Sequence, residues 1–108
     1  MSLEVSRVAL ETIATLRPRV PRSRRHDRSL AVQLVRAASS AVLNWGEGEY
    51  SDPGTKRARY CNAAGSANET RAALAVAVAW GYLPPAQAQP ATSRLDRVIA
   101  MLWKLSRA

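Results

Sequence analysis

The residues best suited to binding chemistry are arginines gathered between residues 17 and 28, in the stretch RPRVPRSRRHDR. Guanidinium groups bind phosphate oxygens through paired hydrogen bonds, and a short segment can present several of them together. The cluster therefore predicts a nucleic-acid-binding site made of Arg17, Arg19, Arg22, Arg24, Arg25 and Arg28. The alternative is that this basic linker is a solvated connector that only contributes charge.

Two acids, Glu47 and Glu69, are the best candidates for a catalytic site. The sequence allows them to be paired carboxylates in a pocket between two helices. No histidine or metal-ligand set accompanies them, so we instead expect each to fix the packing of the helices. The partners that this interpretation offers are Arg36, Asn44, Arg71 and the helix ends.

The remaining reactive side chains are too few to build an active centre. His26 is the only histidine and Cys61 the only cysteine. We expect His26 to lie in a mobile linker, and we interpret Cys61, which has no base beside it, as a small core residue. One histidine and one cysteine cannot supply the ligands of a metal ion. We therefore predict no catalytic residues, no enzymatic activity, no metal and no cofactor.

Length and charge restrict the class of protein. The chain has 108 residues, which predicts one domain over 1–108, and a formal net charge of +8. This excess favours a polyanionic partner, either nucleic acid or an anionic membrane surface. The longest apolar run, residues 72–80, is too short for a membrane-spanning helix, and the first residues lack a secretion-signal pattern. We expect a cytoplasmic protein that does not associate with a membrane.

The periodicity of apolar residues is helical throughout, and no strand pattern is present. Helices are predicted at about 3–16, 29–45, 53–80 and either 85–106 or 91–106. The last start is open, because a helix from Pro85 would be broken or kinked at Pro90. Pro18 and Pro21 are expected to end the first helix. The predicted fold is all-α, an antiparallel up-and-down four-helix bundle.

The second and third predicted helices are apolar on more than one side, which indicates that each packs on two sides. The second has a main stripe of Leu30, Leu34, Ala37, Ala38, Ala41 and Trp45, with Val32, Val35 and Leu43 outside it. The third has one stripe of Cys61, Gly65, Ala72, Val76 and Ala79, and another of Tyr60, Ala63, Ala67, Leu74 and Val78. Alanine-rich cores of this kind are often completed by self-association.

Two of these segments carry motifs of a known family. RAASSAVLNWGEG, at 36–48, resembles the Arg-Ala-x-x-Ser…Asn-x-x-Glu-Gly signature of four-helix-bundle proteins encoded in intervening sequences of bacterial 23S ribosomal RNA genes. AAGSANET, at 63–70, is similar to the Ala-x-Gly-Ser-x-x-Glu motif of that family. The positions that match are Arg36, Asn44, Glu47, Gly48, Gly65, Ser66 and Glu69. We expect these residues to be architectural.

The resemblance carries further expectations. The superfamily looks to include the accessory variability determinant protein of diversity-generating retroelements, a pentameric ring that binds nucleic acid and associates with a reverse transcriptase. The resemblance thus implies a homopentamer, with nucleic acid or a nucleic-acid enzyme such as a reverse transcriptase as partner. Glu49 and Asp52 stand where many relatives have basic residues, which weakens nucleic-acid binding at that edge.

We therefore expect a non-enzymatic oligomeric accessory protein that binds RNA or DNA electrostatically, without strong sequence specificity. The alternative is a protein-interaction scaffold whose basic charge is incidental or matches an acidic protein partner.

Overall fold

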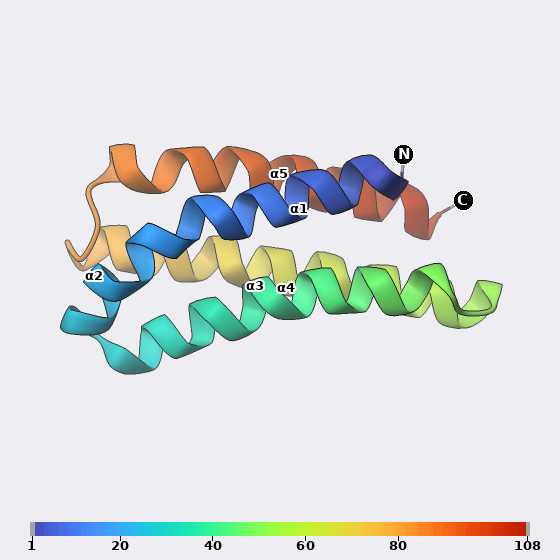
Figure 1. The fold of residues 1–108 in the computed structure, drawn as a ribbon, viewed down its shortest axis with the longest axis horizontal. Helices are drawn as coiled ribbons and strands as arrows, with labels where there is room; N and C mark the ends of the chain where they lie inside the picture. The colour runs from blue at the N-terminus through green and yellow to red at the C-terminus, as the bar shows by residue number, and fades with distance from the viewer. Residues whose placement is uncertain (1, 108) are drawn as a thin grey trace.

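The four long helices of the chain pack as an antiparallel bundle about 42 Å long (Figure 1). The computed structural model describes residues 2–107, and the side chains of residues 4–107. The helices are α1 (Ser2–Leu16), α2 (Val20–His26), α3 (Arg28–Glu49), α4 (Pro53–Ala79) and α5 (Pro85–Ser106). A 3₁₀ turn, η1 (Arg17–Arg19), joins α1 to α2. The described chain contains no strand, and the predicted all-α four-helix fold is confirmed.

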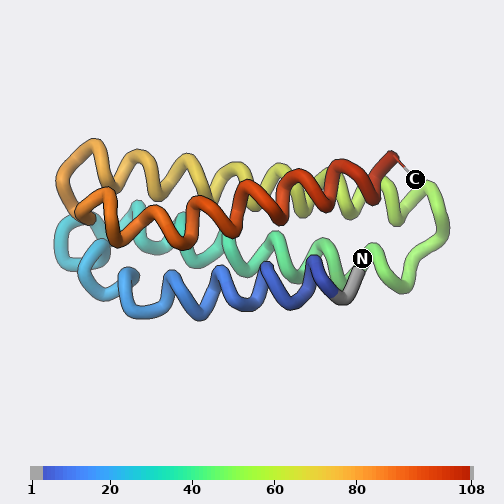
Figure 2. The backbone as a smooth tube through the Cα atoms, turned by 90° about the horizontal axis from the view of Figure 1, so that it is seen from above, coloured from blue at the N-terminus to red at the C-terminus, as the bar shows by residue number. Residues whose placement is uncertain are grey.

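The connections set what lies at each end of the bundle. The start of α1 and the end of α5 lie at one end, together with the turn between α3 and α4 (Figures 1 and 2). The short α2 lies at the opposite end, beside the turn from α4 into α5. The segment richest in arginine is therefore held at the end farthest from both chain termini.

The core consists mostly of alanine and leucine side chains. One face of α1 is buried at helical spacing, through Val5, Val8, Ala9, Thr12 and Leu16. The main stripe of α3 is also buried, except that Trp45 is only half-buried. On α4 the buried stripe is Tyr60, Ala63, Ala67 and Leu74, with Val78 half-buried. Small side chains at these positions let the helices approach closely.

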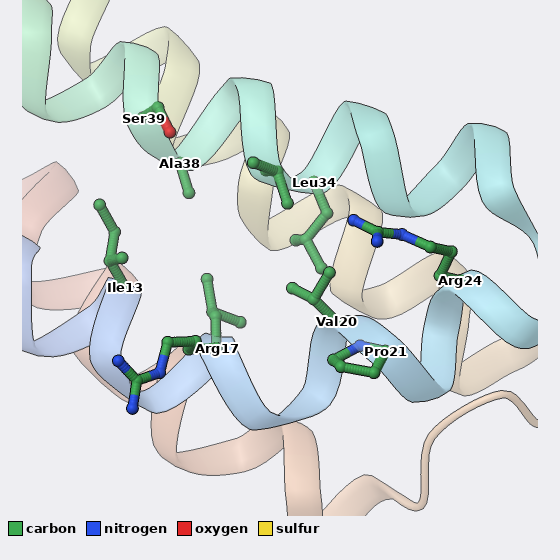
Figure 3. A pocket seen from close by; sticks show the side chains of 10 residues that line it. Ile13, Arg17, Val20, Pro21, Arg24, Leu34, Ala38 and Ser39 are labelled. Carbon is green, nitrogen blue, oxygen red and sulfur yellow. The ribbon is translucent and has the colours of Figure 1, made fainter.

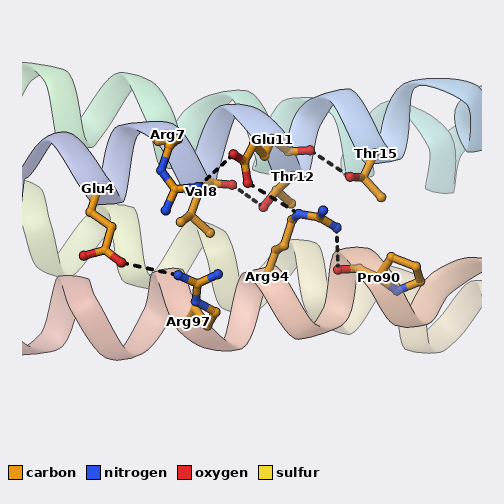
Figure 4. Close-up of polar contacts among 9 residues, drawn as sticks. All are labelled: Glu4, Arg7, Val8, Glu11, Thr12, Thr15, Pro90, Arg94 and Arg97. Atoms are coloured by element: carbon orange, nitrogen blue, oxygen red, sulfur yellow. Dashed lines mark hydrogen bonds and ion pairs between the residues drawn. The ribbon is translucent and has the colours of Figure 1, made fainter.

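Helix α1 packs mainly against α5 rather than α3. Two ion pairs follow this edge, Arg97–Glu4 at 3.3 Å and Arg94–Glu11 at 3.7 Å (Figure 4). Both pairs are partly exposed to solvent, so each contributes little to stability. The side of α1 that faces α3 is left more open as a result.

Residues 17–28 are not the plain linker between two helices that the sequence led us to expect. Most of the segment is helical, and Ser23 of α2 is buried against the bundle. Pro18 and Pro21 do not stop the chain from coiling, because each lies in the first turn of a new helical element. There the missing N–H of proline has no intrahelical partner to lose.

One other helix boundary differs from the prediction, and one boundary that the sequence left open is decided. Helix α3 continues through Gly46 and Gly48 to Glu49. Helix α5 begins at Pro85 and contains Pro90, which settles the start that the sequence left open. Pro90 has no N–H to donate to the Ala86 carbonyl, and both residues lie on the exposed side of the helix. The predicted bounds of α4 agree with the structure to within one residue.

The α3 residues outside the main stripe, and the α4 stripe that contains Cys61 and Val76, lie largely on the surface of this chain. Leu43 is 64% exposed, and Val32, Val35 and Val76 are each about 40% exposed. Gly65, Ala72 and Ala79 are exposed as well. Cys61 lies on this face and is only half-buried, so its interpretation as a core residue is wrong.

Candidate nucleic-acid interface and signature cluster

All six predicted arginines lie at one end of the bundle, on η1, α2 and the first turn of α3. Four of them are exposed to solvent: Arg17, Arg24, Arg25 and Arg28. Arg19 and Arg22 are half-buried, because their positions on η1 and α2 face the bundle. The structure thus brings the six residues together and presents four of them fully to a ligand.

Arg22 has a role in holding the fold. Its Nε donates a hydrogen bond of 3.1 Å to the backbone carbonyl of Tyr82, in the turn between α4 and α5. One helical turn later, the ring of His26 stacks on the Tyr82 ring. Both contacts attach α2 to that turn, which positions the exposed arginines beside them.

The exposed arginines meet no acidic side chain within the described residues. The one acid of the segment, Asp27, accepts the backbone N–H of Leu30 at 3.0 Å and so caps α3. The ion pairs of the molecule use other arginines: Arg7, Arg59, Arg71, Arg94 and Arg97. The positive charge at this end is therefore not neutralised by the chain itself.

Three of the signature residues, Asn44, Glu47 and Ser66, take part in a polar seam between α3 and α4. The hydroxyls of Ser40 and Ser66 lie 2.9 Å apart, and Asn44 donates to both the carbonyl and the hydroxyl of Ser40 at 3.0 Å. Arg59 then donates to the side-chain oxygen Oδ1 of Asn44 at 3.4 Å and pairs with the Glu47 carboxylate at 3.1 Å. This chain of polar contacts fixes the register of the two helices.

Ser40 and Arg59 were not among the residues chosen from the sequence. The spacing of Ser40 and Asn44, one helical turn apart, was a usable signal. No signal in the sequence indicated Arg59, because its pairing with Glu47 arises only when α3 and α4 are placed side by side.

Glu47 and Glu69 do not form a carboxylate pair, which was the alternative to the expected packing role. Glu47 lies seven residues past Ser40, and Glu69 three residues past Ser66 in the antiparallel helix. The helical rise then separates the two acids by about 15 Å along the bundle. Glu47 pairs with Arg59, whereas Glu69 and Arg36 line one surface pocket of about 330 Å³ without an ion pair between them in the described structure.

The two signature glycines serve different purposes. A Cβ on Gly48 would lie 2.8 Å from Cε1 of Tyr60, so only glycine lets the buried tyrosine pack there. The Tyr60 hydroxyl donates a hydrogen bond to the Glu49 carboxylate from this position. A Cβ on Gly65 would meet nothing within 4 Å. Gly48 is therefore required by the fold of one chain, and Gly65 is not.

Among the titratable groups, Asp52 at the start of α4 shows a clear shift. The backbone N–H and the hydroxyl of Thr55 both bond its carboxylate, and they lower the pKa of Asp52. Within residues 2–107, no group of three His, Cys, Asp or Glu side chains is placed to hold a metal ion. None of the described helices combines the length and apolarity needed to cross a bilayer.

The four long antiparallel helices define an all-helical four-helix-bundle protein. A polar seam lies between α3 and α4, and exposed arginines lie at one end of the bundle. Residues 3–104 match the family model described as 23S rRNA-intervening sequence protein, and the chain belongs to this family. A search of curated proteins and a search of solved structures each returned no match.

Proposed function

We propose that this protein is a non-enzymatic accessory protein that binds RNA or DNA electrostatically through its arginine-bearing end. The observation that carries the proposal is the set of exposed guanidinium groups without acidic partners on η1, α2 and α3. Such groups contact phosphates, which carry no sequence information. Binding is therefore governed by the charge and shape of the nucleic acid rather than by its sequence.

Self-association is part of this proposal. The exposed apolar side chains of α3 and α4, among them Leu43 and Val76, are suited to contact a second copy of the chain. Gly65 lies on the same face, where no neighbour within the chain requires a glycine. A ring of copies, with five as the resemblance implies, would repeat the arginine-bearing end and strengthen binding through multivalency. A cytoplasmic location and a reverse-transcriptase partner belong to the same proposal.

The test is binding to structured RNA and to duplex DNA across a salt series, with nuclease-treated protein. Replacing Arg24, Arg25 and Arg28 with glutamine removes three of the exposed charges from the proposed interface. The matched control removes the same charge at the other end of the bundle, through Arg57→Gln, Lys104→Gln and Arg107→Gln.

We expect the log affinity of the unaltered protein to fall linearly with log salt. The interface variant should lower the slope by about 0.9 for each lost phosphate contact, and the control should change it less. Equal losses in the two variants would place binding elsewhere on the surface. Absence of binding at low salt would overturn the proposal.

A further inference from the structure

We propose that a groove between α1, α2 and α3 binds an acidic amphipathic helix of a partner protein. The groove has a volume of about 250 Å³ and opens beside η1 (Figure 3). Its lining residues are Ile13, Leu16, Arg17, Val20, Pro21, Arg24, Leu34, Val35, Ala38 and Ser39. The proposal goes beyond nucleic-acid binding and does not depend on it.

The walls of the groove are apolar and partly uncovered. Leu16 and Leu34 are buried in the chain, whereas Ile13 and Val20 are half-buried and Val35 is 41% exposed. Ile13, Val20 and Leu34 come from three different helices and face the same opening (Figure 3). A ligand that covers them gains hydrophobic stabilisation without moving the backbone.

The apolar surface continues past the groove along α1. Leu10 is 52% exposed and precedes Ile13 by three residues, which places both on one side of the helix. From Leu10 to Leu16, α1 rises by about 9 Å, and η1 then leads to Val20 at the start of α2. This spacing suits the apolar anchors of a docked helix, which lie at positions i, i+3 or i+4, and i+7.

The positive charges at the groove favour a ligand of negative charge. The only charged side chains in its lining are Arg17 and Arg24, and both are exposed. Neither has an ion-pair partner among residues 4–107, and no acid lines the groove. Glutamate or aspartate side chains beside the apolar anchors of a helix would pair with these guanidinium groups.

A nucleobase fits this groove poorly. Ser39 supplies the only uncharged polar side chain of the lining. The polar edges of a base would lose their water without finding enough hydrogen-bond partners. Leucine-like anchors have no such cost, so the groove favours a protein helix.

The helix and nucleic acid would compete for part of one surface. Arg17 and Arg24 belong to both the groove and the proposed nucleic-acid interface, whereas Arg25 and Arg28 lie outside the groove lining. A docked acidic helix would cover two of the exposed arginines. Partner binding is therefore expected to weaken nucleic-acid binding.

The test uses a fluorescently labelled peptide of about 15 residues, held helical by a lactam bridge, with leucines along one face and glutamates beside them. One twin carries lysine in place of glutamate, and another carries serine in place of leucine. We expect the acidic leucine peptide to bind the full protein roughly tenfold more tightly than either twin, measured by fluorescence anisotropy. Equal binding of the three peptides would overturn the proposal.

Paired variants locate the site. Val35→Gln should weaken peptide binding, whereas Val32→Gln, at an equally exposed position of α3 outside the groove lining, should not. Arg17→Glu with Arg24→Glu should lose the acidic peptide and gain the lysine twin. The control with the same change of charge, Arg57→Glu with Lys104→Glu, should retain the acidic peptide. Equal effects within either pair would overturn the assignment.

The result of the peptide-binding test can be distinguished from the result of the nucleic-acid-binding test. Arg25→Gln with Arg28→Gln should weaken nucleic-acid binding and leave peptide binding unchanged. Peptide binding by a protein that binds no nucleic acid would uphold the groove and reject only the function proposed above. If the acidic peptide fails to bind and Val35→Gln dissociates a self-associated protein, the groove is covered by a second copy and the proposal is overturned.

Discussion

The imidazole ring of His26 lies flat on the phenol ring of Tyr82, with ring centroids 5.2 Å apart and planes inclined by 9°. The same tyrosine accepts a hydrogen bond from Arg22 through its backbone carbonyl. Two contacts from one face of α2 thus converge on the turn between α4 and α5. The placement of the exposed arginines depends on a residue far from them in the sequence.

Replacing Tyr82 with alanine should release α2 from this turn. Loss of the stacked pair and of the packing around the half-buried tyrosine should lower the free energy of unfolding by about 1–3 kcal/mol. Urea unfolding measures this change, and amide hydrogen exchange should show reduced protection in α2. Tyr50→Ala is the control, because Tyr50 is 95% exposed and its loss should change neither quantity. Unchanged protection of α2 in Tyr82→Ala would show that Tyr82 does not hold it.

A methyl group at Gly48 should destabilise the bundle. The added Cβ would lie 2.8 Å from the Tyr60 ring and 3.3 Å from Cβ of Arg59, so α3 and α4 must move apart or the ring must shift. We expect Gly48→Ala to cost about 1–3 kcal/mol in the free energy of unfolding. Chemical denaturation tests this, with Gly46→Ala as the control because a Cβ there meets nothing within 4 Å. An equal or higher stability of Gly48→Ala would contradict the packing argument.

A larger side chain at position 65 should have an effect only when copies of the chain associate. Gly65→Leu adds a side chain on the exposed face of α4, where nothing within the chain obstructs its Cβ. We expect the variant to keep its helical circular dichroism but to lose mass in light scattering coupled to size exclusion. Ala100→Leu, at an exposed position of α5, should leave the mass unchanged. A monomeric starting protein, or a Gly65→Leu variant of unaltered mass, would reject self-association through this face.

The cap of α4 should make stability depend on acidity. The hydrogen bonds from Thr55 hold the pKa of Asp52 below the ordinary 3.8 of an aspartate, so the unfolded chain binds the proton more readily. The stabilisation is complete above pH 3.8 and is lost as the pH falls through the lower pKa of the folded state. The melting temperature of Asp52→Ala should be lower than that of the unaltered protein at neutral pH, and this difference should shrink in acid.

Asp52→Asn separates the charge from the cap, because asparagine also caps helices but does not titrate in this range. Its melting temperature should approach that of the unaltered protein as the pH falls. A constant difference between the two proteins across the acidic range would show that Asp52 does not supply this dependence.

The helices with one clear apolar stripe and distinct end signals were predictable from the sequence. The buried face of α1 follows its periodicity, and Asp52 with Pro53 marked the start of α4. The helicity of residues 17–28 was missed because proline signals both the end of one helix and the start of the next. The contacts of α2 with the rest of the bundle, through buried Ser23 and through Arg22 and His26 on Tyr82, favour the second interpretation.

The sequence predicted which segment carries the candidate site, but not which of its side chains are exposed. The run of arginines located the basic end, yet sequence could not separate exposed Arg24 from Arg22, which bonds a carbonyl sixty residues away. Likewise, Glu47 had several possible partners, and the register of α3 against α4 selected Arg59. Local patterns carry such information only when both partners lie on one helix.

Because α1 starts and α5 finishes at the end of the bundle opposite α2, the start of α1 and the end of α5 both lie far from the arginine-bearing end (Figure 2). A tag, fluorophore or surface tether attached to either terminus would extend away from the arginines by most of the 42 Å length of the bundle. The protein can thus be immobilised through its termini while every copy presents its arginine-bearing end to solution.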